Sequence, residues 1–66
     1  MKNNLKVLRA KANISQGDLA DKIAVSRQTI NAMEKAKYVP STVLALKLAQ
    51  FFKVSVEEIF ELETGD

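Results

Sequence analysis

Residues 15–35 read SQGDLADKIAVSRQTINAMEK and contain two helical segments. The segments begin at Ser15 and Ser26, because a serine hydroxyl accepts a hydrogen bond from the free amides of a first helical turn. The first segment has an apolar stripe at helical spacing, formed by Leu19, Ala20 and Ile23. Only residues 24 and 25 separate the two segments, so the stretch predicts two short helices joined by a tight turn.

On the second of these helices, apolar side chains face one way and polar side chains the other. At 100° per residue, the residues of the outer face fall within one arc of about 140° around the helix axis. They are Arg27, Gln28, Asn31, Ala32 and Lys35. Arginine matches the O6/N7 edge of guanine, and asparagine or glutamine matches the N6/N7 edge of adenine. This layout is typical of a helix-turn-helix unit, whose second helix enters the major groove of DNA. The alternative is an ordinary solvated helix face.

The remaining sequence predicts three further helices. Capping residues and apolar spacing place them from Asn3 or Asn4 to about Ala12, from Ser41 to about Phe52, and from Ser55 through Phe60. Pro40 ends the intervening loop, because proline disfavours helix at the preceding residue. No strand alternation or internal repeat is present. We therefore expect an all-α fold of five short helices around one core, with residues 1–66 as a single domain.

The composition excludes several classes of protein. The 66 residues include no cysteine and no histidine, which excludes disulfides, the usual zinc sites and most nucleophile–base pairs. No apolar run approaches the ~20 residues of a membrane span, and the N-terminus is too polar for a secretory signal. We expect a cytoplasmic protein that is not an enzyme, needs no cofactor and binds no membrane or small-molecule ligand. Residues 1–37 carry a net charge of +5 and residues 38–66 carry −3, and a basic half suggests a polyanionic partner.

Several motifs resemble those of the Cro/CI-type (lambda-repressor-like) helix-turn-helix regulators. The matching segments are Leu5-Lys6-x-Leu8-Arg9, Ser15-Gln16-x-x-Leu19-Ala20, Val25-Ser26-Arg27-Gln28-Thr29-Ile30-x-x-x-Glu34, Lys37-Tyr38-x-Pro40-Ser41 and Val54-Ser55-Val56-Glu57-Glu58-Ile59-Phe60. The resemblance runs from about residue 3 to residue 62 and is to the small stand-alone members. It implies the compact five-helix fold of that family, with a helix-turn-helix unit over about residues 15–35.

The resemblance also implies roles for individual residues. It implies base contacts by Arg27, Gln28 and Asn31, and phosphate contacts by Gln16, Thr29 and Lys37. The place of Gln16 at a helix N-terminus favours an anion independently of the family. For the threonine, the alternative is a hydroxyl bonded within its own helix; for the lysine, it is simple solvation. Arg9 and Glu34 resemble the family's structural ion pair between the first and third helices.

Three positions depart from the family pattern, and one of them is Val39, which stands where relatives often carry asparagine and so removes a plausible polar contact from its loop. Ala24 in the turn and Ala36 after the third helix stand where relatives commonly have glycine. If either residue adopts a left-handed conformation, alanine costs roughly 1–2 kcal/mol relative to glycine. These departures concern the geometry of the loops and leave the expected fold unchanged.

The C-terminal half has more apolar side chains than one core requires. Those that fall off the inward stripe are Val43, Leu46, Phe51 and Leu62. Exposed apolar clusters usually mark interfaces, and related small repressors dimerise through this end of the molecule. We therefore expect a dimerisation region over about residues 43–62, with a wider core as the alternative.

Together these features predict a homodimeric, sequence-specific transcriptional regulator that binds double-stranded DNA and represses from a palindromic operator. One alternative is the antitoxin of a toxin–antitoxin pair, which a neighbouring toxin reading frame would reveal. Another is a helical protein–protein adaptor that does not bind DNA. The polar face of Arg27, Gln28 and Asn31 argues against an adaptor, since adaptor surfaces more often show aromatic anchors.

Overall fold

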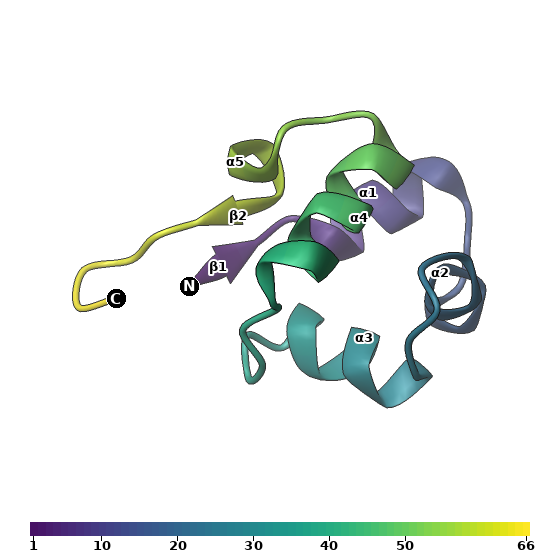
Figure 1. The fold of residues 1–66 in the computed structure, drawn as a ribbon, viewed down its shortest axis with the longest axis horizontal. Helices are drawn as coiled ribbons and strands as arrows, with labels where there is room; N and C mark the ends of the chain where they lie inside the picture. Colours follow the sequence, from purple (N-terminus) through teal and green to yellow (C-terminus); the bar gives the residue numbers. More distant parts are fainter.

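Serine side chains start four of the five helices in the computed structural model, which describes all residues from Met1 to Asp66. The helices are α1 (Leu5–Ala12), α2 (Gln16–Lys22), α3 (Arg27–Glu34), α4 (Thr42–Phe52) and α5 (Val56–Ile59), as Figure 1 shows. The hydroxyl groups that cap the last four helices belong to Ser15, Ser26, Ser41 and Ser55. In α2 and α5 the side chain of Asp18 or Glu58 also accepts from the serine amide, which completes a capping box. The five predicted helices are therefore confirmed.

Left-handed residues end the first four helices. The non-glycine residues at positive φ are Asn13 (56°), Ala24 (57°), Ala36 (57°) and Lys53 (58°). After α3, the amide of Ala36 donates to the carbonyl of Met33 and the amide of Lys37 donates to the carbonyl of Ala32, both at 2.9 Å. This is the hydrogen-bond pattern of a Schellman motif, which usually has glycine at the left-handed position. Both alanines singled out in the sequence therefore occupy the conformation that favours glycine.

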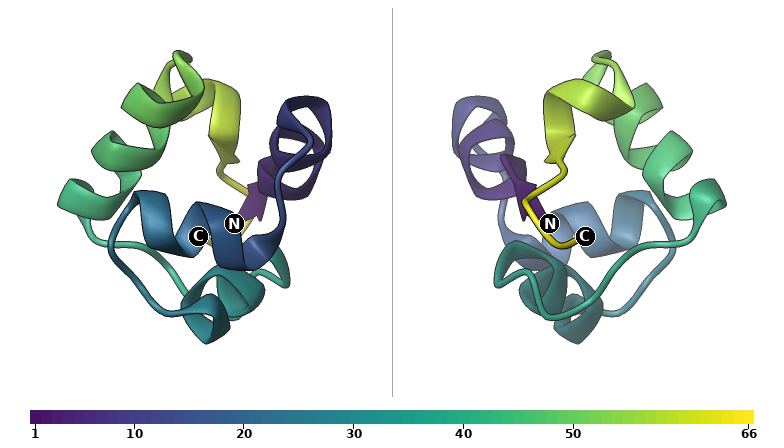
Figure 2. Two further views of the ribbon diagram at one scale, coloured as in Figure 1. Left: turned by 90° about the vertical axis from the view of Figure 1, so that its right-hand side faces the viewer. Right: turned by 90° about the vertical axis from the view of Figure 1, so that its left-hand side faces the viewer.

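The core is formed by ten apolar side chains that come from all five helices and the turn after α2. They are Leu5, Leu19, Ala20, Ile23, Ile30, Met33, Leu44, Leu48, Ala49 and Ile59. Figure 2 shows α1 and α4 on opposite sides of the molecule, with α2 and α3 closing the space between them. The core contains no polar side chain, so the burial of apolar surface supplies its packing energy. None of the helices is long and apolar enough to cross a bilayer.

Two short strands, β1 (Lys2–Asn3) and β2 (Phe60–Glu61), join the two ends of the chain. They pair antiparallel, with Lys2 opposite Glu61 and Asn3 opposite Phe60. The expectation that no strand occurs is wrong here, because a strand of two residues is too short to show alternation. The fifth helix consequently ends at Ile59, since Phe60 already has the extended backbone of β2.

Asn3 and Asn4 attach the start of α1 to two other helices. The Oδ1 atom of Asn3 accepts from the amide of Leu5 at 3.1 Å, while its Nδ2 donates to the carbonyl of Met33 at 2.7 Å. The Nδ2 atom of Asn4 donates to the carbonyl of Glu58 at 3.1 Å. These bonds tie α1 to the end of α3 and to α5, which helps to set the position of α3 on the core.

Candidate nucleic-acid interface

The outer face of α3 is polar because its two large apolar side chains are buried in the core. Arg27 and Gln28 are exposed on this face, and Asn31 is half-buried. The amphipathic pattern predicted for this helix is therefore confirmed. These three residues and Gln16, the first residue of α2, line one surface hollow that has no apolar side chain in its wall. We call it the recognition hollow. The structure thus brings together all three expected base contacts and one expected phosphate contact.

A chain of hydrogen bonds connects the recognition hollow to α1. The Arg9 guanidinium donates twice to the Glu34 carboxylate, from Nε to Oε2 at 2.7 Å and from Nη2 to Oε1 at 3.1 Å. Its Nη1 donates to the carbonyl of Ile14 at 3.1 Å. Gln16 donates from Nε2 to Oε1 of Glu34 at 3.1 Å, and Asn31 donates from Nδ2 to Oε1 of Gln16 at 3.4 Å. Glu34 therefore links α1 to α2, and Gln16 extends this chain of bonds to Asn31 on the outer face of α3.

The ion pair of Arg9 and Glu34 is largely shielded from water, with side chains that are 17% and 6% exposed. Burial raises the pKa of the Glu34 carboxyl, but hydrogen bonds from Arg9 and Gln16 and the charge of Arg9 lower it by more, so the pKa lies below its ordinary value. The same pairing raises the pKa of Arg9. The carboxyl group is therefore ionised at neutral pH and can only accept hydrogen bonds. The ion pair that the resemblance implied is present.

Sequence reasoning missed two contributions to this surface. It treated Glu34 only as a partner of Arg9, and it did not single out Lys6 of α1, which lines an adjoining hollow with Lys35. The bond between Gln16 and Glu34 joins two helices, and no local pattern predicts such a contact. In the sequence, Lys6 appears only as one of the basic residues of the first half of the chain and as part of the Leu5-Lys6-x-Leu8-Arg9 segment, and neither signal places it beside α3.

The two other expected phosphate contacts lie at opposite ends of α3. The Oγ1 atom of Thr29 lies 2.8 Å from Oγ of Ser26, and the Thr29 amide donates to the same hydroxyl at 3.1 Å. The threonine hydroxyl is thus engaged at the start of its own helix, which is the alternative given for it above. Lys37 is exposed in the loop after α3 and takes part in none of the ion pairs of the structure.

Three of the four residues expected at a dimer interface are exposed apolar side chains. Val43, Leu46 and Leu62 keep 64%, 54% and 76% of their surface accessible to water. Leu46 also lines a hollow whose other apolar residues include Val39, Pro40, Val56 and Phe60. This apolar hollow shares no residue with the recognition hollow.

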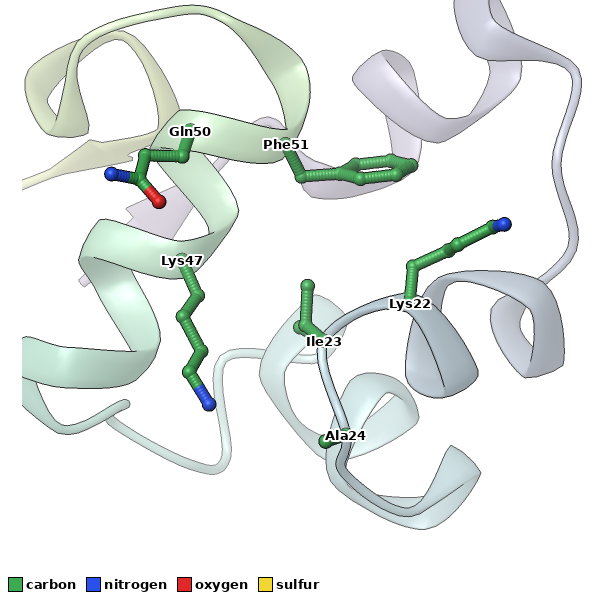
Figure 3. A pocket seen from close by; sticks show the side chains of 6 residues that line it. All are labelled: Lys22, Ile23, Ala24, Lys47, Gln50 and Phe51. Carbon is green, nitrogen blue, oxygen red and sulfur yellow. The ribbon is translucent and has the colours of Figure 1, made fainter.

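Phe51, the fourth expected interface residue, lies on another face of α4. Figure 3 shows its ring above Ile23 at the end of α2, with Lys22 and Lys47 at the sides of the same pocket. The ring is packed against the core and meets Phe52 edge-on, with ring centroids 5.0 Å apart. Phe51 therefore packs between α2 and α4, as in the wider core given above as the alternative for these residues.

Comparison with known proteins places the chain in a family. Residues 5–59 match the model of a helix-turn-helix family. The chain is 59% identical over 66 residues to an uncharacterized HTH-type transcriptional regulator of Methanocaldococcus jannaschii, with 100% of both chains covered. It is 48% identical over 63 residues to the HTH-type transcriptional regulator YgzD of Bacillus subtilis, with 96% of each chain covered. An HTH-type transcriptional regulator of Archaeoglobus fulgidus is 45% identical over 60 residues, which cover 91% of this chain and 84% of that one. The chain therefore belongs to the Cro/CI-type helix-turn-helix family of transcriptional regulators.

Proposed function

We propose that the protein is a homodimeric repressor that reads an inverted-repeat operator through the major groove of DNA. Family membership supports the coarser part of this function, a DNA-binding transcriptional regulator. The observation that carries the proposal is the recognition hollow, where the guanidinium of Arg27 and the carboxamides of Gln28 and Asn31 share one surface with Gln16. Guanidinium and carboxamide groups match the edges of guanine and adenine in the major groove.

The size and polarity of α3 suit this groove. A helix with its side chains is about 10–12 Å across, and the major groove is about 12 Å wide. Arg27 and Gln28 lie in the first turn of α3, and the first residues of a recognition helix are those that contact base edges. In this arrangement Gln16 at the start of α2 and Lys37 beyond α3 would contact phosphates.

A second copy of the chain would supply the second half-site. One recognition helix reads only a few base pairs, too few to select one site among genomic competitors. A two-fold contact through Val43, Leu46 and Leu62 would leave both recognition hollows free, because the apolar hollow and the recognition hollow share no residue. If the two α3 helices occupy successive major grooves, the half-sites lie about 34 Å or 10–10.5 base pairs apart.

Selection of binding sites from a random pool of duplex DNA tests the DNA-binding part of the proposal. We expect enrichment of one inverted repeat, bound with an affinity that falls steeply as salt increases. Gln28→Ala should weaken binding to the enriched site by about 1–3 kcal/mol. Gln50→Ala, an exposed glutamine of α4 outside the recognition hollow, is the matched control and should bind as the wild type does. A pool with no enriched sequence would contradict the proposal.

The oligomeric state tests the dimer. Leu46→Glu places a carboxylate in the apolar hollow, and we expect the variant to sediment as a monomer and to bind the operator weakly. Val7→Glu is the matched control, because Val7 is 52% exposed on α1 and lines neither hollow. A dimeric Leu46→Glu variant would place the interface elsewhere.

A further inference from the structure

Two of the three carboxamides in the recognition hollow, those of Gln16 and Asn31, are held in one orientation by Glu34. Because its carboxylate only accepts hydrogen bonds, the amino end of Gln16 must face it, as the 3.1 Å contact from Nε2 shows. The Oε1 atom of Gln16 then points away from Glu34, and Nδ2 of Asn31 lies 3.4 Å from it. Since an amide oxygen cannot donate, Asn31 turns its own amino end towards Gln16. The charge on Glu34 thus sets the direction of both amides.

Asn31 is left with a defined free edge. A carboxamide has an oxygen and two N–H groups, and only one N–H is used by Gln16. Two amide oxygens repel each other, so Oδ1 of Asn31 stays away from Oε1 of Gln16. The N–H bonded to Gln16 is therefore the one that points away from Oδ1, and the second N–H lies beside Oδ1 on the opposite edge. This edge combines one acceptor with one adjacent donor, and it belongs to a side chain that lines the recognition hollow.

The bonds from Asn31 to Gln16 and from Gln16 to Glu34 are here called the relay. We propose that this relay makes Asn31 specific for adenine, with Gln16 and Glu34 as its positioning residues. An acceptor beside a donor matches the N6 amino group and the N7 atom of adenine. Guanine presents two acceptors at the same positions, and thymine presents an acceptor and a methyl group, so neither matches the oxygen of Asn31. Cytosine offers one donor and makes one bond where adenine makes two. The inference rests on the proposed function, since it names a base that the DNA-binding surface reads.

The relay gives Gln16 an effect that a phosphate contact lacks. A side chain that only contacts phosphate weakens binding to all sequences alike when it is removed. A positioning residue changes the preference at one base pair. The second N–H of Gln16 stays available for a phosphate. Loss of the phosphate contact lowers affinity for all sequences, whereas loss of the positioning effect changes the preference at one base pair, so the two effects can be measured separately.

Competition binding tests the relay with operators that carry each of the four bases at every position. Asn31→Ala identifies the base pair read by residue 31, as the position where discrimination disappears. There the wild type should prefer adenine over guanine by roughly 5- to 150-fold, the range of one bidentate contact. Gln16→Leu keeps a side chain of similar size without the amide, and it should reduce that preference to below about threefold on the same scale. The preference at the base pair read by Gln28 should not change.

Two results of these measurements would overturn the inference. One is a wild-type preference for guanine or thymine at the position that Asn31→Ala identifies. The other is a Gln16→Leu variant that loses affinity equally for all four bases. Glu34→Gln should relax the same position as Gln16→Leu, and its thermal melting profile shows whether the variant remains folded for the comparison.

Nuclear magnetic resonance of the protein without DNA separates this inference from the proposed function. The side-chain amide protons of Gln16 and Asn31 should both shift in Glu34→Gln, because both orientations depend on the carboxylate. Signals that do not respond would overturn the relay even if the protein binds an operator. Signals that respond in a protein that binds no DNA would leave the relay standing, while the proposed function and the adenine assignment would both fall.

Discussion

Ala36 closes α3 in a conformation that is unfavourable for any residue with a side chain. Its φ is 57°, and the residue is exposed, so the methyl group gains nothing from packing. The left-handed conformation costs alanine roughly 1–2 kcal/mol relative to glycine. Glycine also increases the freedom of the unfolded chain, which offsets roughly 0.4–1 kcal/mol of that gain. The balance predicts that Ala36→Gly raises the free energy of unfolding by about 0.8 kcal/mol.

Urea denaturation and thermal melting measure this gain. In a domain of this size, about 0.8 kcal/mol corresponds to a rise in Tm of roughly 3–6 °C. The matched control is Ala10→Gly in the exposed middle of α1, where glycine should cost roughly 0.5–1 kcal/mol. Both substitutions remove one exposed methyl group. A gain in the free energy of unfolding in one variant and a loss in the other would therefore come from the difference in backbone conformation at the two sites. Equal losses in the two variants would refute the reasoning from φ. Ala24→Gly repeats the test in the turn between α2 and α3, with the same sign expected.

Three further predictions concern the ion pair and the loop after α3. Glu34→Ala should lower the free energy of unfolding by about 3 kcal/mol in chemical denaturation, because it leaves the largely buried Arg9 without its charged partner; a loss well below 1 kcal/mol would show that the pair behaves as an exposed one. Because folding lowers the pKa of Glu34, the pair contributes fully above the ordinary glutamate pKa of about 4.3, and this contribution is lost as the pH falls through the lower folded value. Stability should therefore fall less steeply with acid in Glu34→Gln than in the wild type, and parallel acid curves would contradict this. Lys37→Ala should reduce the slope of log affinity for DNA against log salt by roughly 1 per subunit, whereas an unchanged slope would assign Lys37 to the solvated surface.

The helices and their order follow from local sequence. Each serine cap acts on an amide three residues away, and the apolar stripes repeat within two turns, so both signals are complete inside one segment. The shared outer face of Arg27, Gln28 and Asn31 follows from helix geometry in the same way. The left-handed alanines are a partial case. The sequence marks Ala24 and Ala36 as departures from the family pattern, but it is the positive φ of both residues in the structure that establishes their energetic cost relative to glycine.

Contacts between elements follow from the packing of the whole chain. β1 and β2 come from opposite ends of the sequence, and neither is long enough to have a pattern of its own. Leu46 and Phe51 both lie on α4, and both fall off the apolar stripe that the sequence predicts to face inward. The end of α2 covers the side of α4 that carries Phe51, whereas the side that carries Leu46 is exposed. The bonds that join Asn31, Gln16 and Glu34 depend likewise on how α2 and α3 cross. Local signals act over a few residues, whereas these contacts form only once the common core has brought distant segments together.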